Sequence, residues 1–476
     1  MSAAAVRMAA CLAAWPVLGG EASAHALAQR YDLPLPLGYF LAGAGAAVAV
    51  SFLMLALFWR QRPGGERAQR WFMRGSIPRA VVTCCQMTGI GALVLIVSAG
   101  LFGNQNTFKN LAPVSVWVIW WVGFSFLCAL VGNVWGLLNP WTALFGVAER
   151  LARPWAEGLS LRLPYPQALG PWPACALLLV FGWLELVAPG RDVPRNVAIG
   201  VALYSLLTWA GFVAFGREAW LRGGEVFSIV FGLFGRFAPL HVTRESRWRW
   251  TLRPFAVGLL PTAPLGPSMT AFILVVLATV TVDGVMETPL WTAAVERLIG
   301  NPGRGVDPRT YMLLQSALLL AGPLLLAALY LGVVVMMARM AGQPVAPVAG
   351  WFVLSLVPIA IAYHLAHYFS LLALAGQFII PLASDPFGYG WDLFGTTLYR
   401  IDIGVVDARF IWYFAVAAIV IGHIIAVWLG HVTAFTAFGE PSVARRSQYP
   451  MLVLMIGYTM LSLWILAQPI IEPGVR

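Results

Sequence analysis

The feature that most constrains this chain is a series of ten long apolar runs joined by polar loops. Of its 476 residues 60% are hydrophobic and 11% are charged, whereas soluble domains are about 25% charged. Each run is near or above the roughly 17–25 residues that a tilted membrane helix needs, and lipid leaves no partner for open strand edges. The predicted fold is therefore all-α, a polytopic transmembrane helical bundle. The runs are residues 37–59, 83–103, 114–138, 172–189, 195–216, 268–286, 311–338, 349–380, 410–433 and 450–469.

The first 24 residues have the layout of a signal peptide. Arg7 precedes the apolar "MAACLAAWPVLGG", and "EASAHA" offers two overlapping small-residue cleavage frames. Cleavage after Ala24 would make His25 the mature N-terminus, where its amine and imidazole can bind one metal ion together. An uncleaved or differently cut signal, with His25 solvated, is the alternative. We expect a signal at 1–24 and a single membrane domain at 25–476, because no linker or repeat divides the chain.

The charged loops predict the orientation. The net charge of +10 comes from 30 Lys and Arg against 20 Asp and Glu, and Lys and Arg are retained on the cytoplasmic side. We therefore predict that the basic loops face the cytoplasm and that both termini lie on the exported side of the membrane. The stretch "EVFSIVFGLFGRFAPL" is short for a span, and we expect it to be interfacial or re-entrant. The basic loops, predicted to be cytoplasmic, are the loop after the run 37–59 and residues 139–171, 217–267, 339–348 and 434–449.

The composition also excludes several classes of site and partner. The five cysteines show no CxxC spacing, so neither a zinc ribbon nor a disulfide framework is indicated. The sequence contains no glycine-rich phosphate loop, serine triad or dinucleotide fingerprint. The basic loops lack the interleaved aromatic residues of a nucleic-acid surface. The expected partner is the lipid bilayer and not a nucleic acid.

Four of the six histidines lie in two consecutive spans. His364 and His367 are three residues apart and share one helix face, and His423 lies at a matching depth in the next span. His431 lies near the cytoplasmic end. A divalent transition metal, Zn or Cu, is predicted at His25, His364, His367 and His423. A proton or substrate pathway is one alternative, and packing through hydrogen bonds to neighbouring carbonyls, about 1 kcal/mol each, is another.

Acidic residues gather at the predicted outer ends of spans. Hydrolytic metal centres combine carboxylates with imidazoles to hold ions and activate water. Asp283 directly follows the apolar "MTAFILVVLATVTV" and precedes Gly284, so we expect it to be partly buried and to orient a water or a ligand histidine as a catalytic group. A solvated loop or turn is the expected setting for the others. The acids are Asp32, Asp283, Glu287, Asp385 and Asp392.

Several strings resemble a family of bacterial inner-membrane proteins, the fenitrothion hydrolases or their subunits. They are "AHALAQRYDLPLP", "NLAP", "VWGLLNPW", "TVDG", "ETPLW", "HYFSLLALAGQ", "ASDPFGYGWDLFG" and the two late "GH" pairs, over about residues 25 to 470. The resemblance implies a location in the bacterial inner (plasma) membrane, so that the exported termini would be periplasmic. It also implies hydrolysis of an organophosphorus triester, a small hydrophobic substrate, and a second membrane subunit as a potential partner. It supplies no catalytic residue set, so the site residues remain those inferred from the chain itself.

Two other functions use the same residues differently. A transporter or metal-handling protein would use the intramembrane histidines as a translocation site, although the lack of an MxxxM or CxxC array argues against a copper pump. A non-catalytic subunit would leave the chemistry to its partner. Convergence of the imidazoles of His364, His367 and His423 on one point would favour the metal centre over packing.

Overall fold

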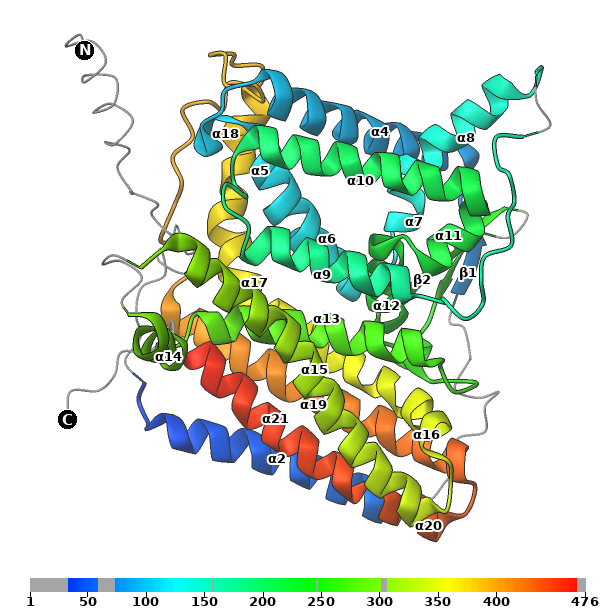
Figure 1. The fold of residues 1–476 in the computed structure, drawn as a ribbon. Helices are drawn as coiled ribbons and strands as arrows, with labels where there is room; N and C mark the ends of the chain where they lie inside the picture. The colour runs from blue at the N-terminus through cyan, green and yellow to red at the C-terminus, as the bar shows by residue number, and fades with distance from the viewer. Residues whose placement is uncertain (1–32, 59–72, 156–157, 245–246, 301–305, 469–476) are drawn as a thin grey trace.

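The structure is a computed structural model that describes residues 33–58, 73–155, 158–244, 247–300 and 306–468 (Figure 1). Within these residues, nine helical segments are long and apolar enough to cross a membrane. They coincide with nine of the ten predicted runs and confirm a polytopic helical membrane bundle. The nine are α2 (Leu37–Phe58), α4 (Arg79–Phe102), α5 to α6 (Leu111–Leu130), α10 (Pro194–Phe215), α13 (Pro267–Met286), α15 (Pro308–Ala341), α16 to α18 (Val345–Ser384), α19 (Ala408–Phe438) and α20 to α21 (Pro441–Ala467).

The tenth predicted run forms the shorter helix α9 (Trp172–Leu186). Its 15 residues give a length of roughly 22 Å, less than a full hydrocarbon core. α9 lies along the same direction as the long helices (Figure 1) and packs against α13. The other elements are η1 (Thr107–Lys109), α7 (Trp135–Leu138), α8 (Pro140–Ala152), η3 (Val257–Leu259), α14 (Pro289–Ile299), η4 (Val353–Leu356), α17 (Val357–Ala375) and η5 (Gly376–Phe378).

The third span differs from its predicted bounds of 114–138. It begins with α5 (Leu111–Pro113), continues as the π-helix η2 (Val114–Gly123) and ends with α6 (Phe124–Leu130). The prediction extended it too far because the next residues are also apolar. They instead form a turn and α7, and Asn139 then caps α8 by accepting a hydrogen bond from the Thr142 N–H at 3.1 Å.

The apolar stretch within the basic segment is buried and re-enters the bundle. α11 (Arg217–Gly223) leads to α12 (Val226–Phe237), most of whose residues are buried. The Glu225 carboxylate accepts hydrogen bonds from two N–H groups at the start of α12 and from the Tyr204 hydroxyl at 2.7 Å. Since Tyr204 lies midway along α10, α12 begins deep in the bundle and returns to the same end. This agrees with the re-entrant alternative and not with an interfacial helix.

A small antiparallel sheet, absent from the predicted all-α fold, covers one end of the bundle. It consists of β1 (Met73–Ser76), β2 (Leu240–Arg244) and β3 (Trp248–Leu252), in the order β1-β3-β2. Gly132, just after α6, lies so close to Leu240 that a Cβ there would be 2.2 Å from the Leu240 carbonyl oxygen. This contact seats the sheet on the end of α6.

Two groups of helices meet at α13 and α17. One group contains α4, α10 and η2, and the other contains α2, α15, α19 and α21 (Figure 1). α17 contacts both η2 and α19, while α13 contacts both α9 and α15. α20 (Pro441–Ser447) precedes α21 (Tyr449–Ala467). Any group shared by α13 and α17 therefore lies at the seam between the two halves.

Candidate metal centre

A glycine allows α13 and α17 to approach closely beside the predicted catalytic acid. A Cβ on Gly284 would lie 2.6 Å from the Tyr363 hydroxyl oxygen of α17 and 2.7 Å from a methyl carbon of Ile465 on α21. A larger side chain at this position would force the Tyr363 ring and the Ile465 side chain to shift. Because Asp283 is the preceding residue, this contact also holds its backbone against α17.

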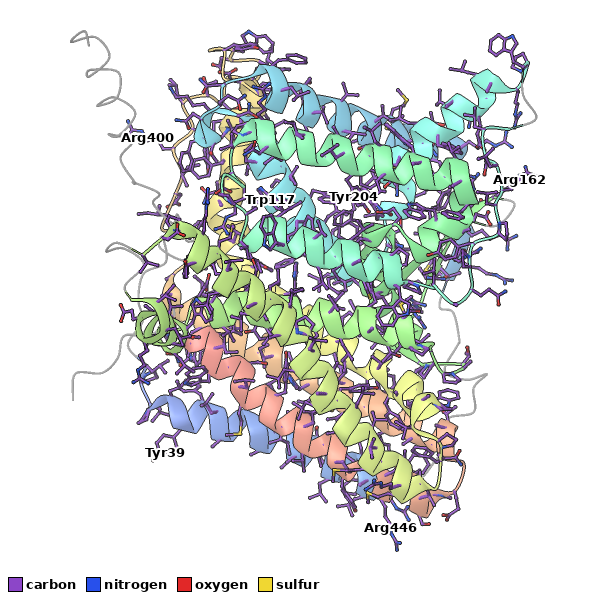
Figure 2. The ribbon with its side chains drawn as sticks, viewed as in Figure 1. Tyr39, Trp117, Arg162, Tyr204, Arg400 and Arg446 are labelled. Carbon is purple, nitrogen blue, oxygen red and sulfur yellow. The ribbon has the colours of Figure 1, made fainter. Side chains whose placement is uncertain are left out.

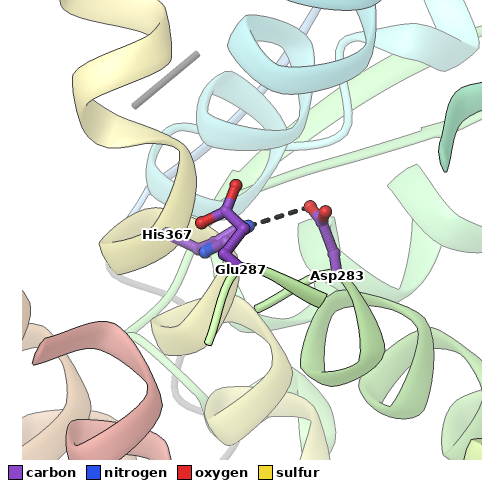
Figure 3. A group of neighbouring side chains, drawn as sticks. All are labelled: Asp283, Glu287 and His367. Atoms are coloured by element: carbon purple, nitrogen blue, oxygen red, sulfur yellow. Dashed lines mark hydrogen bonds and ion pairs between the residues drawn. The ribbon is translucent and has the colours of Figure 1, made fainter. Parts of the chain in front are cut away.

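Two carboxylates from the end of α13 meet an imidazole from α17 (Figure 3). Asp283 and Glu287 are four residues apart, so they share a helix face. Their oxygens and a ring nitrogen of His367 all lie within 4.8 Å of one another. His367 Nε2 is 2.8 Å from Asp283 Oδ2, and the His367 side chain is 2% exposed, against 15% for Asp283. The three residues form a nearly buried group with the geometry of a candidate metal site.

Tyr368 fixes the orientation of one of these carboxylates. Its hydroxyl donates a hydrogen bond of 2.7 Å to Asp283 Oδ2, the same atom that His367 contacts. A hydrogen bond from outside a ligand set orients the ligand and tunes its basicity. Tyr368 therefore acts as a positioning residue for Asp283.

A small cavity lies beside this group. It is lined by Glu185 of α9, His364 and Tyr368 of α17, Trp121 of η2 and several apolar side chains, and its volume is about 20 Å³. A cavity of that size holds about one water if polar partners surround it. Glu185 is close enough to Asp283 and His367 for their charges to interact. The cavity therefore brings a further carboxylate, Glu185, to Tyr368, the residue that bonds to Asp283.

His364 points into an aromatic cage rather than toward the carboxylates. Its ring centroid is 5.6 Å from that of Trp121, 5.9 Å from that of Phe234 and 4.7 Å from that of Tyr368. Its Nε2 is buried and has no hydrogen-bond partner among the described residues. His364 thus lines the cavity, and it does not belong to the group with Asp283.

His423 faces a different helix from the other predicted ligands. Its Nδ1 lies 2.8 Å from the Ile419 carbonyl oxygen of its own helix, and its ring is 6.2 Å from that of Tyr458 on α21. The adjacent Gly422 is the residue that contacts α17, since a Cβ there would lie 2.4 Å from the Ala362 Cβ. A helix turns by about 100° per residue, so His423 points away from the seam.

The remaining candidates occupy other settings. His431 Nδ1 lies 3.0 Å from Gln448 Oε1, and Asp385 and Asp392 accept backbone N–H bonds within their own loop. His25 and Asp32 lie outside the described residues, as does the predicted signal at 1–24.

Sequence reasoning missed two acidic members of this region. Glu287 was noted as a span-end acid but not as a ligand, and Glu185 was not singled out. The signal for Glu287 is its spacing of four residues from Asp283, and the signal for Glu185 is its position inside the apolar "FGWLELV". An ionisable residue within a membrane span is a functional candidate by default.

The donor set of Asp283, Glu287 and His367 fits a divalent metal ion. Two carboxylate oxygens and one imidazole nitrogen are ligands that Zn²⁺ accepts, and catalytic zinc sites use three protein ligands with one open position. Copper favours softer or nitrogen-rich sets. The four described cysteines are free thiols: Cys84, Cys85, Cys128 and Cys175.

Comparison with known proteins found no match for this chain among protein-family models, curated proteins or solved structures.

Proposed function

We propose that this membrane protein is a metal-dependent hydrolase of neutral organophosphorus triesters, with Asp283, Glu287 and His367 as its metal ligands. The observation that carries the proposal is the meeting of these three ligand groups within 4.8 Å at the seam of the bundle. A bound divalent ion would supply a Lewis acid that polarises a phosphoryl oxygen and activates water. The resemblance to fenitrothion hydrolases supplies the substrate class.

The side chains around the group have separate tasks in this proposal. Tyr368 holds Asp283 through the hydrogen bond to Oδ2. Glu185 lines the cavity and would hold water there by hydrogen bonding. The aromatic rings around His364 limit the access of bulk water, and a neutral aryl triester reaches the bundle by partitioning into the bilayer.

A second function is favoured by the size of the cavity. At about 20 Å³ it holds a water but no aryl phosphotriester, so a hydrolase must open the seam to admit substrate. A transporter or metal-handling protein would use Glu185, His364 and Tyr368 as a proton or ion path without that opening. A third alternative is a non-catalytic subunit that assembles with a second membrane subunit and leaves the chemistry to it.

Metal binding and turnover of the purified protein test the proposal. The protein is loaded with Zn²⁺, freed of excess metal, and analysed for metal content and for nitrophenol release from a parathion-type triester, with and without chelator. We expect about one equivalent of metal, and turnover that chelator abolishes and Zn²⁺ restores. Metal without turnover favours the metal-handling function, and the absence of both favours the non-catalytic subunit.

Three substitutions locate the metal. His367→Gln is expected to lose the metal, whereas His431→Gln, which removes a buried histidine paired with Gln448, is expected to keep it. His423→Gln decides whether the sequence-predicted ligand takes part, and we expect it to keep the metal because that ring faces α21. Equal loss in all three variants would contradict the assignment.

A further inference from the structure

A pocket on the small sheet, lined by described residues, lies away from the candidate metal centre. Its volume is about 650 Å³, within the range of roughly 300–1,000 Å³ typical of small-molecule sites. Its lining consists of Arg74, Gly75, Ser76, His241, Thr243, Arg249, Trp250 and Thr251. All of these residues belong to the three strands.

The strand register explains why this lining is polar. Arg74, Thr251 and His241 are direct partners across the sheet and form one row. Ser76, Arg249 and Thr243 form the next row two residues along. Because side chains in a strand alternate between faces, both rows point to the same face. That face carries two arginines, a histidine and three hydroxyl groups, with no acid among the six.

The opposite face of the sheet packs on the bundle. Leu240 contacts Gly132, and the ring of Trp248 lies within 3.7 Å of where a Cβ on Gly136 would be. Leu240 and Trp248 therefore pack the sheet against the bundle, which leaves the basic face outward. Arg74 and Arg249 are both exposed.

The sheet lies at the membrane boundary. β1 ends at Ser76 and, two residues later, the chain enters the membrane helix α4 at Arg79. The Ile77 N–H also bonds to the Trp248 carbonyl oxygen at 2.9 Å, which ties the start of α4 to β3. A ligand in the pocket would therefore be within reach of lipid headgroups.

We propose that this face binds a phosphate group, carried by an anionic phospholipid headgroup or by a free phosphate ester. Arginine guanidinium groups bind phosphate oxygens through paired charge-assisted hydrogen bonds. The hydroxyl groups of Ser76 and Thr243 are further donors, whereas the Thr251 hydroxyl donates to the His241 carbonyl oxygen at 3.3 Å. No acidic side chain among the lining residues opposes an anion.

The His241 ring adds no positive charge to this face. Burial, together with nearby Arg253 and Arg236, lowers the pKa of His241 to about 4, so its ring is neutral near pH 7. The positive charge of the face therefore comes from Arg74 and Arg249.

Binding by the intact purified protein tests the site, with two probes that separate the sources. One arm titrates inorganic phosphate and follows the thermal unfolding midpoint. The other arm titrates short-chain phosphatidylglycerol against phosphatidylcholine and follows lipid retention by native mass spectrometry. The variants are Arg74→Gln and Arg249→Gln. The matched control is Arg244→Gln, an exposed arginine on the opposite face of β2.

We expect binding in wild type and in Arg244→Gln, and roughly tenfold weaker binding in each face variant, since a hydrogen bond to a charged group contributes about 1.5–3 kcal/mol. Saturable binding of phosphatidylglycerol over phosphatidylcholine assigns the phosphate to lipid. Saturable binding of phosphate alone assigns it to a soluble ester. No saturable binding in either arm, or equal weakening in Arg244→Gln, overturns the proposal.

Discussion

The imidazole of His367 on α17 and the carboxylate of Asp283 on α13 are joined by a contact of 2.8 Å, 84 residues apart in sequence. The pair lies where the two halves of the bundle meet, and the Tyr368 hydroxyl bonds to the same carboxylate oxygen. Two helices are thus held together by polar groups that lipid cannot solvate. The group therefore stabilises the packing of the two helices, and it also contains the ligand atoms of the candidate metal site.

Asp283→Asn is expected to lower the free energy of unfolding by about 3 kcal/mol, because it removes the negative charge from a buried pair with the His367 imidazole. Tyr368→Phe removes one hydrogen bond and is expected to cost about 0.6–1.5 kcal/mol. Denaturation of the purified protein by SDS titration measures both. A larger loss in Tyr368→Phe than in Asp283→Asn would show that the carboxylate is not the centre of the network.

Gly422→Ala is expected to destabilise the packing of α17 against α19 by about 1–3 kcal/mol, the usual cost of overpacking. A Cβ there would lie 2.4 Å from the Ala362 Cβ and 2.9 Å from the Pro358 carbonyl oxygen. Gly430→Ala, on the same helix with nothing within 4 Å of the added carbon, is the control and should be neutral or slightly stabilising. Thermal unfolding compares the two, and equal midpoints would contradict the close approach.

His241→Gln is expected to reduce the loss of stability at acid pH. The pKa of His241 is about 4 in the folded protein and 6.5 in the unfolded chain, because burial and then Arg253 and Arg236 disfavour the charged ring. The unfolded chain therefore binds the proton first, and wild-type stability falls as pH drops from 6.5 toward 4. Unfolding midpoints across this range should fall more steeply in wild type than in the variant. Parallel curves would show that the ring is not held neutral.

The end of the bundle that carries the sheet is expected to face the cytoplasm, since Arg162 and Arg446 of the basic loops lie there while Tyr39 lies at the other end (Figure 2). In a variant without native cysteines, Leu398→Cys, whose parent side chain is 91% exposed, should react with an impermeant maleimide in intact spheroplasts. Gln343→Cys should react only after lysis. The reverse pattern would invert the topology.

The packing of the first and last long helices also concerns the membrane topology. α2 and α21 are antiparallel, because Gly45 lies against Met460 while Phe52 lies 6.0 Å from Tyr449. Leu37 and Ala467 are therefore at the same end of the bundle. An even number of membrane crossings puts the first and last helices' outer ends on one side, and among the described residues the nine long segments together with α9 give such a number. The labelling of Leu398→Cys tests this topology.

The sequence by itself determined the class of fold and the extent of most spans, because length and hydropathy are local properties that lipid imposes on each segment separately. It also identified Asp283 as a buried acid needing a partner. It did not determine the π-helical entry of the third span or the sheet, in which β3 pairs with β2 and also with β1, a strand that ends at Ser76, 164 residues before β2 begins at Leu240.

Only the tertiary structure decided which ionisable groups meet. His364 and His367 share a face in sequence, yet one ring enters an aromatic cage and the other meets Asp283 and Glu287. His423 matches His364 in predicted depth but faces α21. Depth follows from position along a helix, whereas direction follows from the rotation of the helix about its axis, which packing against neighbours sets. Contacts such as those at Gly284 and Gly422 fix that rotation.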